Sequence, residues 1–418
     1  MKSILKSALM FAAASTLSMG FTACSDDKDD NGGSDNQPTE QEQLMKSLTS
    51  AYVNDVVYPT YKNLAANTET LFNQLVDAKA KFRNGTLTQG DIDRACETFK
   101  TARSWWETSE AFLYGAATDF GIDPHIDTWP LDRVALAKSL SNKTVVAELD
   151  DLDEGGIDNA RALVGEQQLG FHGIEFILFR DGKNRTLAAL QAKEDNEDFA
   201  SYNVTGEEEL IFACAVAGDL RDKTFQLEVA WMGEDAPTAH QERVEECEFP
   251  VNVASIDGLF YGDNLINATQ AGSTYKTWRQ VMSTILIAGC DNICAEVAGQ
   301  KIGQALSGED PDYIESPYSQ RSYYDFFDNI SSIQYALNGQ RSTEAAANSL
   351  MLYLQKYNAA EAATLKGKLD AALNALATAK AGTPFVLEPQ SANAKAAQDA
   401  INALSEELQN AAKWISEN

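Results

Sequence analysis

Apolar residues recur at helical spacing along most of the chain, most clearly near its end. One apolar seam there consists of Ala397, Ile401, Leu404, Leu408, Ala411 and Ile415. An earlier stripe, interrupted at Glu361, consists of Leu350, Leu354, Tyr357, Leu365, Leu369, Ala372 and Leu376. Between them "AGTPF" (381–385) supplies Gly and Pro, which end helices. The pattern predicts two long antiparallel helices with a short link, the elements of a helical bundle.

Similar patterns predict further helices upstream. They cover residues 42–83 (bent at Pro59), 89–115, 159–182, 205–231, 273–307 (with Gly289 as a weak spot) and 320–338. Residues 118–132, 232–241 and 308–316 are predicted loops, and hairpin-bounded alternating strands are scarce. We therefore predict an all-α fold of two four-helix-bundle-like halves, residues 41–240 and 241–418, with the junction inside 232–252.

The N-terminus has the sequence features of a targeting segment. Lys2 and Lys6 precede a short apolar stretch that ends at "FTAC", which resembles a bacterial lipobox although Phe21 stands where Leu is usual. This predicts a signal peptide over residues 1–23 and lipidation of Cys24, which would anchor the protein to a membrane. The alternative is an ordinary secretory peptide with a nearby cysteine. The acidic, apolar-poor residues 24–40 predict a flexible tether.

The start of that tether, "CSDDKDDNGG", resembles the surface-export signal of Bacteroidetes lipoproteins. We therefore expect an outer-membrane lipoprotein exposed at the cell surface, with the periplasmic face as the alternative location.

Net charge and cysteine content reduce the number of possible functions. The formal net charge is −29 and the chain has no basic run, which argues against a nucleic-acid partner. Acidity favours solubility and can raise the local concentration of cations. Beyond Cys24 the chain has five cysteines, an odd number without a CxxC pair, so buried free thiols are expected rather than a disulfide framework.

The stretch "LGFHGIEFILF" (169–179) places His172 and Glu175 among apolar residues. Positions three apart lie on one face of a helix, so the two side chains can bind one cation, or the carboxylate can orient the imidazole. The alternative is a purely structural His–Glu hydrogen bond that offsets the cost of burial. Gly170 and Gly173 would let another backbone or a ligand come close. HExxH and GxSxG motifs are absent.

Four segments carry a family resemblance. They are "RSWWETSEAFLYG" (103–115), "IDTWPLD" (126–132), "GFHGIEF" (170–176) and "ESPYSQRSYYDFFDNISSI" (315–333). In this order they resemble the imelysin-like family with its GxHxxE signature, and with "TPF" near 383 the likeness covers residues 44–418. The resemblance implies two helical-bundle halves with the GxHxxE helix near their junction. The family includes proteins classed as metallopeptidases and envelope proteins associated with iron uptake.

The resemblance also carries site residues over to this chain. His172 and Glu175 are the first candidates for metal ligands. Glu110 is a candidate for a further carboxylate ligand or, in a peptidase, the general base. Asp127 could bind metal or fix its loop through turn hydrogen bonds.

Three residues are expected to line a cleft at the same place, and the remaining histidines are not. Arg103 could bind an anionic substrate group or form an ion pair with Glu107 or Glu110, and Trp129 and Ser319 are expected beside it. His125 and His240 lie in predicted loops. We expect both at the surface, although His125 could supply a ligand.

Three functions remain open. The favoured one is an envelope lipoprotein that binds a metal ion, iron rather than zinc, or a metal-bearing ligand, and passes it to a transporter. Carboxylates with one histidine suit such cations. The second is a zinc-type metallopeptidase with Glu110 as the base. The third is a non-catalytic binding protein in which the His–Glu pair is only structural.

Overall fold

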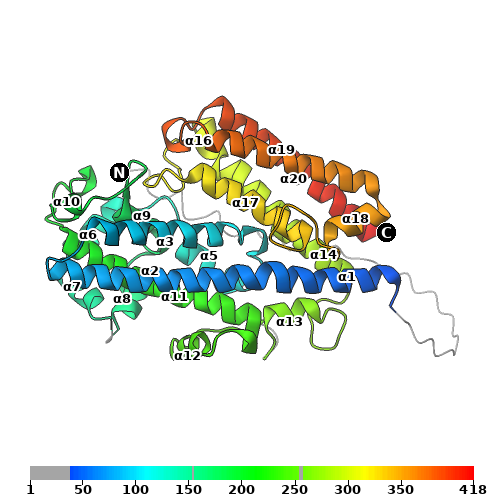
Figure 1. The fold of residues 1–418 in the computed structure, drawn as a ribbon, viewed down its shortest axis with the longest axis horizontal. Coiled ribbons are helices and arrows are strands. Elements are labelled where there is room, and N and C mark those ends of the chain that lie inside the picture. The colour runs from blue at the N-terminus through cyan, green and yellow to red at the C-terminus, as the bar shows by residue number, and fades with distance from the viewer. Residues whose placement is uncertain (1–37, 153–154, 254–257) are drawn as a thin grey trace, which may run out of the picture. The chain divides into compact units, whose positions relative to one another are not determined.

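Helices make up nearly all the regular structure of the residues described by this computed structural model, which are 38–152, 155–253 and 258–418 (Figure 1). The first helices are α1 (Glu40–Ala51), α2 (Tyr58–Arg83), α3 (Gln89–Glu107), α4 (Ala116–Asp119), α5 (Ile122–Ile126), α6 (Arg133–Ser141), α7 (Lys143–Asp150), α8 (Gly156–Leu163), α9 (Gly170–Leu178), α10 (Leu187–Leu190), α11 (Gly206–Met232), α12 (Thr238–Glu246) and α13 (Tyr261–Ile266). The later helices are α14 (Trp278–Ser283), α15 (Asn292–Glu296), α16 (Gly303–Ser307), α17 (Ser322–Asn338), α18 (Leu350–Tyr357), α19 (Ala359–Lys380) and α20 (Ala392–Glu417). The prediction of an all-α fold is confirmed.

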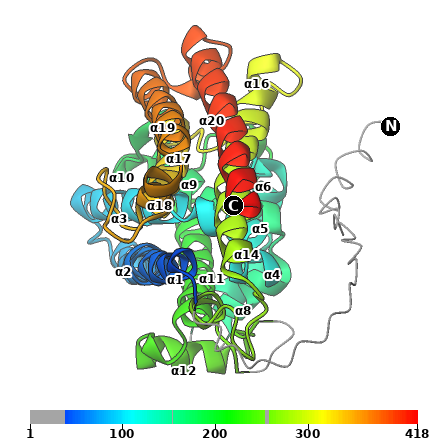
Figure 2. The same cartoon turned by 90° about the vertical axis from the view of Figure 1, so that its right-hand side faces the viewer.

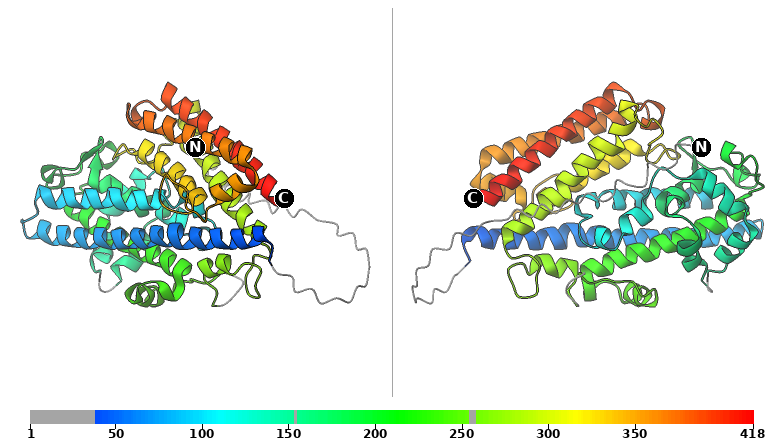
Figure 3. Two further views of the ribbon diagram at one scale, coloured as in Figure 1. Left: turned by 45° about the vertical axis from the view of Figure 1, so that its right-hand side comes forward. Right: turned by 180° about the vertical axis from the view of Figure 1, so that it is seen from behind.

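Thr39–Asn418 forms one compact unit that contains two groups of helices. In the first group, α11 packs along α2, and α2 packs against α3, as the view from behind shows (Figure 3). Almost every residue of α11 is buried, so it is the central helix of this group. In the second group, α17 packs on α19, and α19 on α20 (Figure 2). The groups meet where α3 and the turn Glu110–Phe112 contact α17.

The apolar seams predicted near the C-terminus are buried as expected. All six seam positions of α20 are inside the core. The preceding stripe is divided at Asn358, whose side chain caps α19 by accepting a hydrogen bond from the amide of Glu361. The predicted single helix over 350–376 is therefore two helices, and Glu361, which interrupts the stripe, lies in the first turn of α19.

Residues 278–307 form one helical stretch in which α14, α15 and α16 are joined by π-helical turns, Thr284–Asp291 and Val297–Lys301. It is long and apolar enough to span a membrane by composition, yet 56% of its most apolar window is buried in the fold. Gly289, the predicted weak spot, lies in the π-helical turn Thr284–Asp291, where the stretch departs from α-helical geometry. A Cβ there would lie 2.1 Å from the carbonyl oxygen of Ala111, so glycine permits close contact between the groups.

Three local predictions need correction. The segment 159–182 is not one helix, because α8 ends at Leu163 and α9 begins at Gly170. The predicted loop 232–241 contains the start of α12, which packs with α13 on α11. A short hairpin, β1 (Phe179–Arg180) with β2 (Lys183–Asn184), follows α9 around an Asp-Gly turn. That dipeptide is a recognised hairpin signal, but strands of two residues each are too short to show an alternating apolar pattern.

Two further predictions concern the N-terminal residues and the cysteines. The predicted signal peptide (1–23), Cys24 and nearly all of the predicted tether lie outside the described residues. The remaining five cysteines are free, and four of them are buried, which confirms the expectation from sequence.

Candidate metal centre

The GxHxxE helix meets the end of α5 through a close backbone contact. Gly170 begins α9 with φ +63°, and a Cβ at this position would lie 1.9 Å from the carbonyl oxygen of Ile126. The glycine therefore lets a backbone approach, one of the two possibilities expected from sequence. Asp127 follows Ile126 directly, so this contact brings its carboxylate to the imidazole of His172.

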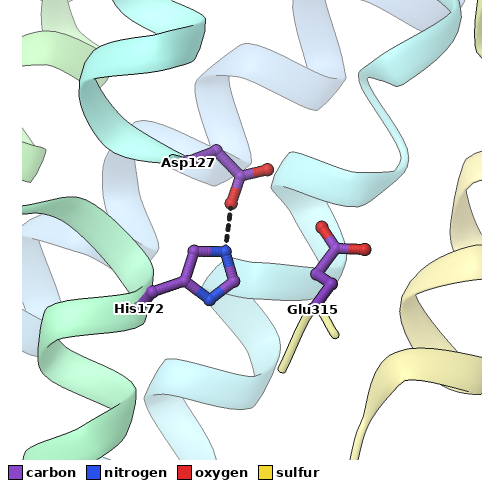
Figure 4. Close-up of side chains that lie close together, drawn as sticks. All are labelled: Asp127, His172 and Glu315. Carbon is purple, nitrogen blue, oxygen red and sulfur yellow. Dashed lines mark ion pairs between the residues drawn. The ribbon is translucent and has the colours of Figure 1, made fainter. Parts of the chain in front are cut away.

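Asp127, His172 and Glu315 each offer one ligand atom, and these atoms lie within 4.8 Å of one another. Figure 4 shows the three side chains pointing into one space, from the end of α5, from α9 and from the segment before α17. Nε2 of His172 is 3.0 Å from Oδ1 of Asp127. The contact lacks hydrogen-bond alignment, so it is an electrostatic one and Nε2 has no hydrogen-bond partner among the described residues.

The other ring nitrogen of His172 faces Glu175. Nδ1 lies 3.6 Å from Oε2 of Glu175, while Oε1 accepts hydrogen bonds from the backbone N–H and the hydroxyl of Ser319, at 2.8 and 2.6 Å. Glu175 thus connects α9 to the segment before α17. This geometry suits a carboxylate that orients a metal-binding histidine from behind.

Glu110 lies in a second group of possible ligands, formed with Glu107 and Asp127, whose atoms also lie within 4.8 Å of one another. Oε2 of Glu110 is buried without a hydrogen-bond partner among the described residues. Asp127 is common to both groups. The structure therefore brings Glu110, Asp127, His172 and Glu175 into one centre, although no group of three contains Glu110 together with His172.

Two cationic side chains hold the carboxylates together. Arg103 is 1% exposed and forms ion pairs with Glu107, Asp127, Glu315 and Asp325. Its guanidinium is surrounded by protein carboxylates. It therefore forms ion pairs within the fold and has no open face for an anionic substrate. Lys301 is fully buried and lies 3.0 Å from Oε1 of Glu315.

The carboxylates outnumber these cations. Six carboxylates, all at most 3% exposed, belong to the centre: Glu107, Glu110, Asp127, Glu175, Glu315 and Asp325. Uncompensated charge is costly in a buried site, so some of these carboxylates must bind protons. Burial indeed raises the pKa of Glu315 to about 8 and that of Asp325 to about 7. It also raises the pKa of Glu110 well above its ordinary value.

His172 and Asp127 form the charged pair of the centre. Burial opposes protonation of the imidazole, but contact with Asp127 and Glu175 raises the pKa of His172 to about 9. Burial would raise the pKa of Asp127, but Arg103 and His172 hold it below its ordinary value. A ligating imidazole must be neutral, so His172 would have to release this proton before it could bind a metal ion.

The remaining predicted residues separate into those at the centre and those outside it. Trp129 lies beside the centre, with its ring centroid 6.4 Å from that of His172. His125 lies outside the centre, where Nε2 is 2.7 Å from Oδ2 of Asp219. The expectation that His240 is a surface residue is wrong. The residue is 8% exposed and stacks on Phe225, and its Nδ1 lies 2.5 Å from Oε2 of Glu228.

Four residues of the centre were not singled out from the sequence as site residues. Glu107, Glu315 and Asp325 lie inside the quoted family segments, so their position in those segments was an available signal. Lys301 lies outside them, in the stretch 278–307, and no sequence pattern distinguishes it from a surface lysine of a helix.

Comparison with known proteins identifies the family of the chain and supports the fold. A family model described as Imelysin matches residues 57–411. The chain belongs to the imelysin family. It is 26% identical over 337 residues to iron-regulated protein A of Synechococcus elongatus, covering 80% of this chain and 76% of that protein.

Two solved structures share the fold of this imelysin-family chain. One, from Parabacteroides distasonis, is described as a candidate iron-regulated protein A precursor. It has a TM-score of 0.70 and 23% identity over 91% of this chain and 96% of that one. The other is an imelysin-like protein from Psychrobacter arcticum, with a TM-score of 0.55 and 12% identity over 90% and 93% of the two chains.

Proposed function

We propose that this imelysin-family protein binds a metal ion, iron in the first place, through Asp127, His172 and Glu315. The observation that carries the proposal is the convergence of these three ligand groups in one buried space. Nε2 of His172 and Oε2 of Glu315 both lack hydrogen-bond partners among the described residues, so each is free to bind a cation. A cation would also balance the excess of carboxylates.

The donor set favours iron over softer metals. Two carboxylates and one imidazole suit Fe²⁺, Mn²⁺ or Zn²⁺ better than Cu⁺, which prefers sulfur ligands. The relative from Synechococcus elongatus is named for iron regulation, and this supports iron as the first ion to test.

Within this proposal Glu175 is an orienting group rather than a primary ligand. It faces Nδ1 of His172, the nitrogen on the side away from Asp127. Its second oxygen is fixed by Ser319. A ligating histidine is commonly held through its other ring nitrogen in this manner.

Burial supports binding rather than peptide hydrolysis. Asp127, His172 and Glu315 are 3%, 2% and 0% exposed. A catalytic zinc needs an open coordination position that a peptide carbonyl can reach. A small cation can enter a buried centre of this kind during a brief opening, whereas a peptide chain cannot.

The proposed cellular context is the envelope. A lipid anchor at Cys24 would hold the protein at the outer membrane, exposed at the surface, where an envelope transporter would receive the metal. The motif at residues 21–24 and the acidic residues that follow support this part of the proposal.

Calorimetric titration tests the proposal. The chain from residue 24 with Cys24→Ser, stripped with chelator, is titrated with ferrous, ferric and zinc ions beside His172→Ala and Glu315→Gln. We expect one ion per chain in the parent and a loss of at least about 100-fold in affinity in both variants. His125→Ala is the matched control, because it removes an imidazole from a carboxylate pair outside the centre. A parent that binds none of these ions would refute the proposal.

A further inference from the structure

The ammonium group of Lys301 has the surroundings of a bound cation. It lies 3.0 Å from Oε1 of Glu315 and 3.7 Å from Oε2 of Glu107. Glu110 and Glu296 each place an oxygen 3.9 Å away. Four carboxylates thus converge on one positive charge, which is fully buried.

This ammonium position adjoins the proposed metal position and shares a ligand with it. One oxygen of Glu315 faces Lys301, while the other has no hydrogen-bond partner among the described residues and is free for the metal. Asp127 belongs to both groups of possible ligands, the one with His172 and the one with Glu107 and Glu110. Carboxylates shared between neighbouring positions are the arrangement expected of a centre for two cations.

The backbone around Lys301 is specialised for this placement. The lysine ends the π-helical turn Val297–Lys301, and such turns inside α-helices occur frequently at functional sites. Its ammonium also lies 5.1 Å from the centroid of the Trp129 ring, which lies beside His172 as well. The position of the lysine is therefore fixed by its helix, by carboxylates and by an aromatic ring.

We propose that the Lys301 ammonium permanently fills the second cation position of the centre and so restricts the protein to a single metal ion. The inference rests on the proposed function, because it assumes that a metal binds at Asp127, His172 and Glu315. A fixed charge of +1 at this position keeps Glu107 and Glu110 beside a cationic partner whether or not the metal is present. It also removes these carboxylates from metal coordination.

Metal stoichiometry tests this inference. Lys301→Ala removes the ammonium and leaves its carboxylate partners in place. The parent and the variant are loaded with Mn²⁺ or Fe²⁺, freed of excess ion and analysed for bound metal per chain, with calorimetry on the same samples. We expect one ion in the parent and two in Lys301→Ala. Lys79→Ala is the matched control, because Lys79 is a buried lysine paired with Asp150 outside the centre, and it should keep one ion.

The outcomes separate the two proposals. A parent with one ion and a folded Lys301→Ala variant that also binds one ion would overturn this inference and leave the proposed function intact. A parent that binds two ions would likewise overturn it. A parent that binds none would overturn both proposals.

A second measurement covers a variant that does not fold. The parent is treated with an amine-acylating reagent, with and without metal, and modification of Lys301 is read by peptide mass spectrometry. A permanently seated ammonium stays unmodified in both states, as expected here. Modification that appears when metal is added would mean that the metal displaces Lys301, and the inference would be wrong.

Discussion

Replacement of Ser319 by alanine tests how the two groups of helices are joined at the centre. The Ser319 hydroxyl donates a 2.6 Å hydrogen bond to Oε1 of Glu175, a carboxylate that is 1% exposed. The backbone N–H of Ser319 donates to the same oxygen at 2.8 Å, and Oε2 has no hydrogen-bond partner among the described residues. The variant therefore leaves a buried carboxylate with one donor in place of two.

The expected cost follows from this geometry. A hydrogen bond to a charged group contributes about 1.5–3 kcal/mol, so we expect Ser319→Ala to lower the free energy of unfolding by about 2 kcal/mol. The unfolding entropy is about 2.1 cal/mol/K per residue, or about 0.8 kcal/mol/K for the roughly 380 residues of Thr39–Asn418. The corresponding fall in Tm is about 2–4 °C.

Guanidinium chloride unfolding of metal-free protein measures this effect, and an unchanged m-value would show that the unfolded state is unaffected. Ser416→Ala is the control, because the exposed Ser416 hydroxyl donates only to a carbonyl of its own helix. It should change stability by less than about 0.5 kcal/mol. If Ser319→Ala is no more destabilising than this control, the Ser319–Glu175 contact does not join the two groups of helices. A double-mutant cycle with Glu175→Gln should return about 1–2 kcal/mol of coupling.

Three further predictions concern the centre. The folded-state pKa values of Glu315, about 8, and His172, about 9, lie above the ordinary values of 4.5 and 6.5. Folded protein therefore binds more protons than unfolded protein in this pH range. The free energy of unfolding of the metal-free protein should fall as pH rises from 6.5 to 9, by roughly 3 kcal/mol for His172 alone. Denaturant titrations across this range should show the fall in metal-free protein and a flatter profile in iron-loaded protein. Arg103→Met should destabilise metal-free protein by about 3–5 kcal/mol, because it removes one charge of a buried ion network, and an unchanged midpoint of chemical unfolding would contradict that role. Gly170→Ala should lower the free energy of unfolding by more than about 3 kcal/mol and weaken metal binding, because its Cβ would clash with the carbonyl of Ile126. A variant with the parent's Tm and affinity would show that this close contact is not needed.

The fold was largely predictable because apolar periodicity records which face of a helix is buried. The seam of α20 is the clearest example, with each predicted position in the core. Helix boundaries were less predictable where backbone geometry departs from the α-helix. The π-helical turns in 278–307 keep the spacing of apolar residues, and the break at Asn358 is marked only by the interruption of the apolar stripe at Glu361.

The centre was predictable only in part. His172, Asp127 and Glu175 stood out because histidines are few and their segments match a family pattern. Glu315 and Lys301 did not, because acidic residues and lysines are common in this chain and most lie at the surface. Their burial is a property of tertiary packing, which brings residue 315 beside Arg103, 212 positions earlier in the chain.

The most direct test of the metal centre is an anomalous difference map from crystals of the iron-loaded protein, recorded at the iron edge. We expect one peak bound by Nε2 of His172 and by carboxylate oxygens of Asp127 and Glu315, at about 2.0–2.3 Å, with the Lys301 ammonium still beside Glu315. A peak on the opposite side of the imidazole, bound by Nδ1 of His172 and Glu175, would contradict the ligand assignment. The absence of any peak in iron-soaked crystals would contradict the metal centre itself.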